Sequence, residues 1–234
     1  MPGPPAPAID DYLVRKQIQF RSVQEMFQEV ATTISSITSI VGATGGTSGL
    51  VKITAPAHGL STGNKVIVNE VLGTTEANGY WTVTVIDAAT LTLDSSTFAN
   101  TYTSGGALYN GDVYSVSFSG APSTAASVVA NIKQINTSGA VVNVYTTRTL
   151  ITDTSNHDFM VTDGAYAQAI SSLTVSSNQA ATDLTATIIV RETTGKGGSS
   201  YTIARATIPP KYSLVIGGDG VRSMYKDTGL PYVS

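Results

Sequence analysis

Apolar and polar residues alternate along much of the chain after residue 50. In the stretch 80–86, Trp81, Val83 and Val85 fall on one face, and polar or amphipathic residues fall on the other. The stretch 184–190 alternates in the same way, with Thr185 and Thr187 between apolar residues. A period of two is that of a half-buried antiparallel strand. The pattern therefore predicts a mainly β protein.

Residues 50–109 contain short strand-like runs separated by turn residues. The segment STGNK at 61–65 predicts a turn, and ANGY at 77–80 carries the Asn-Gly signal of a tight hairpin. We expect these residues to form a small β-barrel-like module. Its strand-like runs are LVKIT, KVIVN, GYWTVTVI and TLTLD.

Residues 110–234 repeat this style over a longer stretch. Their number of strand-like runs predicts an antiparallel β-sandwich or jelly roll. The segment 122–136 fits either a helix or a further strand. The seven runs are DVYSVSF, GAVVNVYTT, HDFMVT, QAISSLTVSS, DLTATIIVRE, SYTIARATI and YSLVI.

Residues 10–41 have a different period. Apolar residues recur there at alternating spacings of three and four, a heptad pattern that predicts an α-helix over about residues 11–35. The β-branched segment TTISSITSIV weakens the pattern toward its end. We expect this stripe to attach the chain to a neighbour or to a second copy; the alternative is packing on its own β-domain. The predicted interface residues are Phe20, Val23, Phe27, Val30, Ile34 and Ile37.

Two segments predict connections. Residues 1–9 are Pro-rich and suit an extended arm that lies across a neighbouring subunit, or a disordered tail. Residues 42–49, GATGGTSG, are Gly-rich and predict a flexible linker between the helix and the first β-module.

Composition narrows the classes of function. Charged residues make up 12% of the chain and its net charge is −3. No basic cluster of the kind that binds nucleic acid is present. The absence of cysteine excludes thiol catalysis, disulfides and thiolate metal sites. No signal peptide and no long apolar run occur, so we expect a soluble protein without a membrane partner, made in a host cytoplasm.

Catalytic motifs are not evident. His58 and His157 lie about a hundred residues apart, and no GxSxG motif marks a nucleophilic serine. Asp153, Asp158 and Asp163 are spaced five apart and fit solvated loop acids better than a loose cation site. The segment GKGGSS at 195–200 lacks the spacing of a phosphate-binding loop. We therefore expect a non-enzyme with no catalytic residues, no cofactor and no metal.

One set of residues between 53 and 93 has a recognisable pattern. It consists of His58-Gly59-Leu60, Gly63, Val66, Asn78-Gly79, Val83, Val85 and the closing TLTL at 90–93. With this pattern, the segment resembles a small β-module that is common in bacteriophage structural proteins and is named after the first catalytic-cysteine half-domain of ubiquitin-activating enzymes. Residues 140–216 are loosely similar in rhythm to the β-sandwich of phage neck, tail and decoration proteins.

The resemblance implies a structural protein of a virion, in the neck, tail or baseplate, assembled with other virion proteins and with copies of itself. Capsid decoration is the nearest alternative. A second alternative is a module that binds host glycan through Tyr80, Tyr102 and Tyr109. In the structural interpretation His58 hydrogen-bonds backbone or faces solvent, and Trp81 is a core residue rather than a sugar platform.

Overall fold

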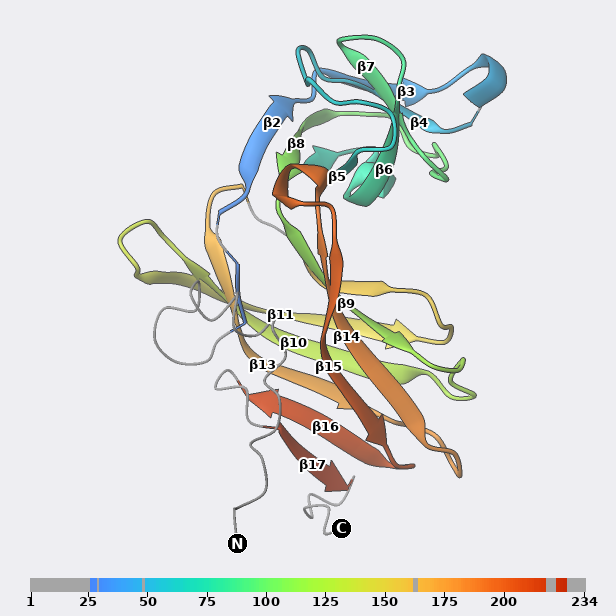
Figure 1. Ribbon diagram of the computed structural model, residues 1–234, viewed down its shortest axis with the longest axis vertical. Coiled ribbons are helices and arrows are strands. Elements are labelled where there is room, and N and C mark those ends of the chain that lie inside the picture. The colour runs from blue at the N-terminus through green and yellow to red at the C-terminus, as the bar shows by residue number, and fades with distance from the viewer. Residues whose placement is uncertain (1–25, 29, 48, 162–163, 218–221, 227–234) are drawn as a thin grey trace, which may run out of the picture.

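The protein consists of two β-modules, one above the other in Figure 1. The computed structural model describes residues 26–28, 30–47, 49–161, 164–217 and 222–226. All strand pairs in these residues are antiparallel. The prediction of a mainly β protein is confirmed.

The small β-module is one curled sheet with the strand order β2-β8-β5-β6-β7-β4-β3. Two 3₁₀ turns, η1 (Gly45–Thr47) and η2 (Thr75–Ala77), lie in its loops. Its strands are β2 (Thr32–Ser36), β3 (Ser39–Gly42), β4 (Val51–Thr54), β5 (Lys65–Leu72), β6 (Gly79–Val85), β7 (Thr90–Leu93) and β8 (Ser104–Asn110).

The sheet of the small module curls because β6 changes partner along its length. Its first half pairs with β5 and its second half pairs with β7. The two ends of the sheet are joined where β2 passes into β3. There, the Ile37 amide donates to the carbonyl of Gly106, and the Thr38 amide donates to that of Thr54. The interior is filled by aliphatic side chains, among them Ile53, Val66, Leu91 and Leu108, all fully buried.

The sandwich consists of two sheets. One has the order β11-β10-β13-β16-β17, with β1 also paired to β13, and the other has the order β12-β9-β14-β15. The short turn η3 (Thr194–Lys196) joins β14 to β15. The strands are β1 (Met26–Gln28), β9 (Asp112–Phe118), β10 (Ala126–Ile135), β11 (Val141–Ile151), β12 (His157–Val161), β13 (Ala167–Ser176), β14 (Leu184–Glu192), β15 (Ser200–Ile208), β16 (Tyr212–Gly217) and β17 (Arg222–Lys226).

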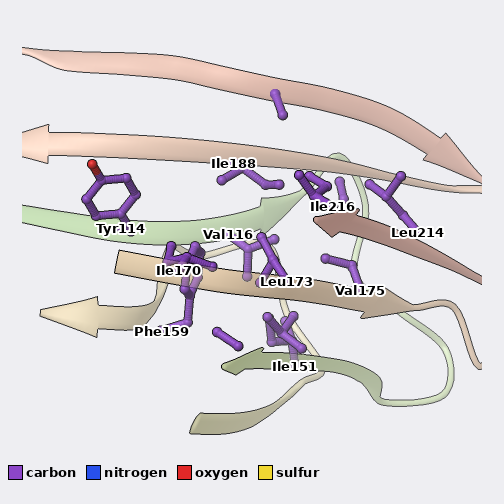
Figure 2. Close-up of a cluster of buried hydrophobic side chains, with 14 of the residues drawn as sticks. Tyr114, Val116, Ile151, Phe159, Ile170, Leu173, Val175, Ile188, Leu214 and Ile216 are labelled. Carbon is purple, nitrogen blue, oxygen red and sulfur yellow. The ribbon is translucent and has the colours of Figure 1, made fainter. Parts of the chain in front are cut away.

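The core of the sandwich lies between these sheets. Figure 2 shows Val116 of β9 and Ile188 of β14 facing Leu173 and Val175 of β13. The apolar positions of the predicted alternation in 184–190 all belong to this cluster. Period-two patterning therefore placed these side chains on the correct face. The seven predicted runs each overlap one strand, and the undecided segment 122–136 contains the strand β10.

The predicted N-terminal helix is wrong wherever the structure describes its residues. Residues 26–28, 32–36 and 39–42 form strands β1, β2 and β3, while residues 10–25 lie outside the described residues. Ile, Thr and Ser dominate this part, and β-branched side chains favour strands. The spacing of three from Ile34 to Ile37 to Ile40 comes from two short strands joined at Ile37–Thr38, not from a helical turn.

The predicted linker also has a different role. Residue 42 ends β3, and residues 43–47 and 49 lie in the loop of the β3–β4 hairpin. The small module therefore begins before residue 50, because β2 and β3 belong to its sheet. At its other end, the expected boundary between residues 109 and 110 falls beside Gly111, which separates β8 from β9. The arm predicted at residues 1–9 lies outside the described residues.

The Asn-Gly pair at 78–79 does not form a two-residue hairpin. The loop from β5 to β6 contains η2, and Asn78 follows it. The Asn78 side chain accepts from the Val71 amide at 3.0 Å and donates to the Val71 carbonyl at 3.1 Å. Asn78 thus acts as a side-chain link to β5, a role that a dipeptide turn signal does not reveal.

Candidate functional site

The two modules meet at a junction centred on Gly111 and Thr193. The Gly111 amide donates to the Thr193 hydroxyl at 3.0 Å, and the Thr193 amide donates to the Gly111 carbonyl at 3.0 Å. Thr193 is fully buried. These bonds attach the end of β14 to the single residue that connects β8 with β9.

Three further hydrogen bonds cross the junction. The Lys65 amide donates to the Thr194 hydroxyl at 2.7 Å, and the Lys65 ammonium donates to the Gly198 carbonyl at 2.9 Å. The Tyr80 hydroxyl donates to the Glu192 carbonyl at 2.7 Å. The η3 loop of the sandwich is therefore held against β5 and β6 of the small module.

Arg191 occupies the centre of the polar part of the junction. Its guanidinium lies 4.5 Å from the centre of the Tyr80 ring, a cation–π contact. It pairs with Asp158 and donates to the Ser115 hydroxyl at 3.1 Å, and Ser115 donates to Asp158 at 2.8 Å. Burial raises the pKa of Tyr80 to about 12, although Arg191 opposes this shift. Tyr80 therefore stays protonated and keeps its donor.

An apolar cluster completes the junction. It joins Ile67 and Tyr109 of the small module to Val113 of the sandwich, with Tyr80 and Val161 packed against it. Because side chains from both modules share this cluster, the modules form one continuous hydrophobic contact. The polar and apolar contacts together make the junction a packed, hydrogen-bonded interface rather than a flexible hinge.

Lys196 and Asp112 add an ion pair beside this cluster. Lys196 Nζ lies 3.4 Å from Asp112 Oδ2, and the Asp112 residue is only 4% exposed. A buried carboxylate is costly without a cation beside it. Lys196 of η3 thus compensates the negative charge of Asp112, the first residue of β9.

His58 has a structural role in the small module. Its Nδ1 accepts from the Leu60 amide at 3.0 Å, so Nε2 carries the proton that it shares with the Asp87 carbonyl at 3.1 Å. The residue is 4% exposed. Both ring nitrogens are thus engaged with backbone, as the structural interpretation of the sequence expects. Neither is available as a general base in this arrangement.

Trp81 and the two nearby glutamates also hold the small module together. Trp81 packs against its core, and the indole donates to the Ala77 carbonyl at 2.7 Å. Glu70 accepts from Tyr109 at 3.0 Å. Glu76 accepts from the amides of Ala99 and Asn100 and from the Asn100 side chain. Desolvation would raise the pKa of Glu76, but these hydrogen bonds outweigh it and lower the pKa to about 2.

His157 contacts both an acid and a serine, but in the wrong arrangement for a catalytic triad. Asp153 Oδ1 lies 2.8 Å and Ser155 Oγ 3.2 Å from the same nitrogen, Nε2. A triad needs the acid on one ring nitrogen and the nucleophile on the other. Ser155 also donates to Asp153 at 2.6 Å. The Ser155 hydroxyl and then His157 lower the pKa of Asp153 to about 2.

The aspartates that the sequence offered as a possible cation site do not form one, as far as the structure describes them. Asp153 bonds to Ser155 and His157, whereas Asp158 pairs with Arg191. Asp163 lies outside the described residues. Among the side chains that the structure describes, no group of three or more His, Asp or Glu is placed to hold a metal ion. Nor does the described part of the chain contain a helix long and apolar enough to span a bilayer.

The three tyrosines of the glycan alternative are engaged in internal contacts. Tyr80 reaches the junction, and the Tyr102 hydroxyl donates to the Gly105 carbonyl at 2.8 Å. Tyr109 is 4% exposed and bonded to Glu70. These rings do not form an exposed platform on which a sugar could stack.

Half of the predicted subunit interface falls at or before β1. Phe20 and Val23 lie outside the described residues. Phe27 belongs to β1, where its backbone is in register with Ala169 of β13. This pairing adds β1 to the six-stranded sheet of the sandwich. The heptad pattern did not predict it.

The other half lies in the small module or just before it. Val30 is 40% exposed, Ile34 packs against the core, and Ile37 is 6% exposed inside that core. Ile37 is therefore covered by its own chain, which is the alternative that the sequence left open. The described part of the stripe does not form a single apolar face.

Sequence reasoning missed two features. Arg191, Asp158 and Ser115 come from three strands, and no local motif joins them. The edge strand β11 carries exposed Val142, Val144 and Leu150. A signal for β11 was present, since its valines adjoin each other and its only charge is Arg148.

Comparison with known families identifies one part of the chain. Residues 46–110 match the ubiquitin-activating enzyme E1 FCCH domain, a non-catalytic module. No curated protein and no solved structure matches the chain significantly. The matched residues run from the β3–β4 loop to the end of β8. The small β-module of this protein is thus similar to an E1 FCCH domain, without the cysteine chemistry of such enzymes, because the chain has no cysteine.

Proposed function

We propose that the protein is a non-enzymatic structural subunit of a bacteriophage particle, in the neck, tail or baseplate. The observation that supports this role is the junction, where hydrogen bonds, the cation–π contact of Arg191 with Tyr80 and a shared apolar cluster join two β-modules into one body. A subunit of a particle must keep its contact surfaces in fixed relative positions. Such a junction suits that requirement.

The arrangement of reactive side chains agrees with this role. His58 and the His157 loop use their polar atoms to fix backbone and side chains locally. The similarity of residues 46–110 to a non-catalytic module points in the same direction. Partners in this proposal are other virion proteins and further copies of the chain.

The test is to locate the protein in particles. Antibodies raised against the purified chain are applied to phage particles released by the strain that encodes it, by immunoblot and by gold labelling in the electron microscope. Label at the neck, tail or baseplate supports the proposal. Uniform label over the head shows capsid decoration instead, and particles that lack the protein show that the virion role is wrong.

A further inference from the structure

Two acids stand at the end of a row of core-facing residues on β9 and β14. Within this row, opposed residues such as Val116 and Ile188 face the core of the sandwich. The row ends with Asp112 opposite Glu192, and these residues are only 4% and 5% exposed. Like charges directly opposite each other destabilise a sheet, and buried charges are costly without a partner. The pair therefore requires a compensating group.

The η3 loop brings a lysine to this pair. Lys196 Nζ lies 3.4 Å from Asp112 Oδ2. Glu192 Oε2 lies 3.1 Å from the position that a Cβ on Gly197 would occupy, so its carboxylate lies against the residue that follows the lysine. Opposed residues on one face have Cβ atoms about 4.5–5.5 Å apart, which brings the two carboxyl groups within reach of each other. An amine and two carboxyl groups thus meet at one buried place.

Arg191 does not belong to this group of side chains. It precedes Glu192 in β14, so its side chain lies on the opposite face of the sheet, where it contacts Asp158 and Tyr80. Lys196 is thus the cation that η3 places on the inward face. Unlike the guanidinium of arginine, its amine becomes a nucleophile when it loses a proton.

We propose that Lys196 and Asp112 condense after folding into an intramolecular amide, with Glu192 as the proton carrier. Transfer of a proton from the ammonium to the Asp112 carboxylate gives a neutral amine and a neutral acid. The Lys196 Nζ lone pair then forms a bond to Asp112 Cγ. Glu192 takes a proton from the nitrogen and gives it to the departing hydroxyl, one Cγ–O bond breaks, and water leaves. The reaction needs no oxidant or co-reactant, and Glu192 is regenerated.

The surroundings of the three groups favour this reaction. Fixed neighbours react as if at effective concentrations of about 10⁵–10⁸ M. The amide replaces a buried ion pair with a neutral group, so the desolvation cost of two charges is removed. The Lys196 side chain is partly exposed, which leaves a path for the released water. The bond would fasten η3 to β9, beside the contacts of η3 with the small module.

The mass of the purified protein tests the proposal. The wild-type chain should be lighter than its sequence by one water molecule. Trypsin should not cleave after the acylated Lys196, so digestion should give a branched peptide that joins residues 66–133 to residues 192–205. Tandem mass spectrometry of this peptide should place the link between Asp112 and Lys196.

Three variants separate the roles. Lys196→Arg keeps the charge beside Asp112 but has no nucleophilic amine, so it should keep its full mass. Glu192→Gln keeps both reacting groups but cannot take up a proton. It should slow the condensation by about a hundredfold or more, so that the freshly purified variant also keeps its full mass. Lys211→Arg, in the turn between β15 and β16, is the matched control and should lose water as the wild type does. Circular dichroism checks that each variant is folded.

Each contrary outcome has a definite meaning. A wild-type chain with the full mass of its sequence overturns the proposal and leaves Lys196 and Asp112 as an ion pair. A loss of water that persists in Lys196→Arg also overturns it, because the water then came from another place. A loss that persists unchanged in Glu192→Gln overturns the role of Glu192. These measurements use purified protein, so their result is independent of whether the protein is found in virions.

Discussion

The module junction and the β11 edge both expose backbone groups and side chains of β-strands to a neighbour or to solvent, and they differ in what covers them. At the junction, Tyr80 covers the Arg191 guanidinium and Thr193 is fully buried. On β11, the single arginine, Arg148, is exposed beside exposed valines. The junction is a completed interface inside one chain. The β11 edge also has backbone hydrogen-bonding groups, apolar side chains and an arginine, but none of the described residues packs over its outer side. Equivalent residue types should therefore contribute very differently to stability at the two places.

The largest difference is expected between the two arginines. Arg191→Ala removes the partner of Asp158 and the cation beside Tyr80, and both side chains of the ion pair are less than one-third exposed. The free energy of unfolding should fall by about 2–4 kcal/mol. Arg148→Ala should change it by less than about 0.5 kcal/mol. Urea unfolding of purified variants measures both. Equal effects would remove the distinction between junction and edge.

A smaller difference is expected between two threonines. Thr193→Val keeps the side-chain shape but leaves the buried Gly111 amide without its acceptor. The cost should be about 1–3 kcal/mol. Thr146→Val on β11 serves as the control, and it should be nearly neutral because its hydroxyl bond to Asn131 is exposed. Amide exchange at Gly111 should quicken only in Thr193→Val; unchanged exchange would mean that Thr193 does not secure the junction.

The smallest effect concerns Tyr80. Tyr80→Phe keeps the ring over Arg191 and loses only the bond to the Glu192 carbonyl, a cost of about 1 kcal/mol. Burial raises the pKa of Tyr80 from 10.0 to about 12. A raised pKa means that the protonated hydroxyl is favoured in the folded state. Its contribution is therefore complete below pH 10 and disappears as the pH rises through 12.

Ultraviolet titration of tyrosine measures this shift. The spectrum of wild type minus Tyr80→Phe should show one phenol that ionises near pH 12. A difference spectrum with its midpoint near the ordinary tyrosine value would mean that Tyr80 is solvated, and that the junction is looser than its hydrogen bonds indicate.

Sequence alone predicted the strands well and the N-terminal region poorly, for physical reasons. A strand in a sheet with one buried face must alternate apolar and polar residues, as 184–190 does. Such a strand can therefore be recognised from a few consecutive residues. Residues 26–41 are ambiguous, because apolar spacings of three and four also arise when short strands are interrupted by a turn. In this region the β-branched composition favours the strands that are observed, whereas the apolar spacing favoured a helix, which was wrong.

The sequence by itself determined the β class, the runs that become strands, and the absence of thiol chemistry. It also indicated that His58 serves structure, because a turn-rich strand module gives an isolated histidine backbone groups to bind. Only the tertiary structure decided that residues 43–47 and 49 belong to a hairpin loop, that Arg191 contacts Tyr80, and that β11 lies at an edge. These facts depend on which strands become neighbours. Alternation fixes the face on which a side chain lies. The order of strands in a sheet follows from long-range pairing, about which a local period carries no information.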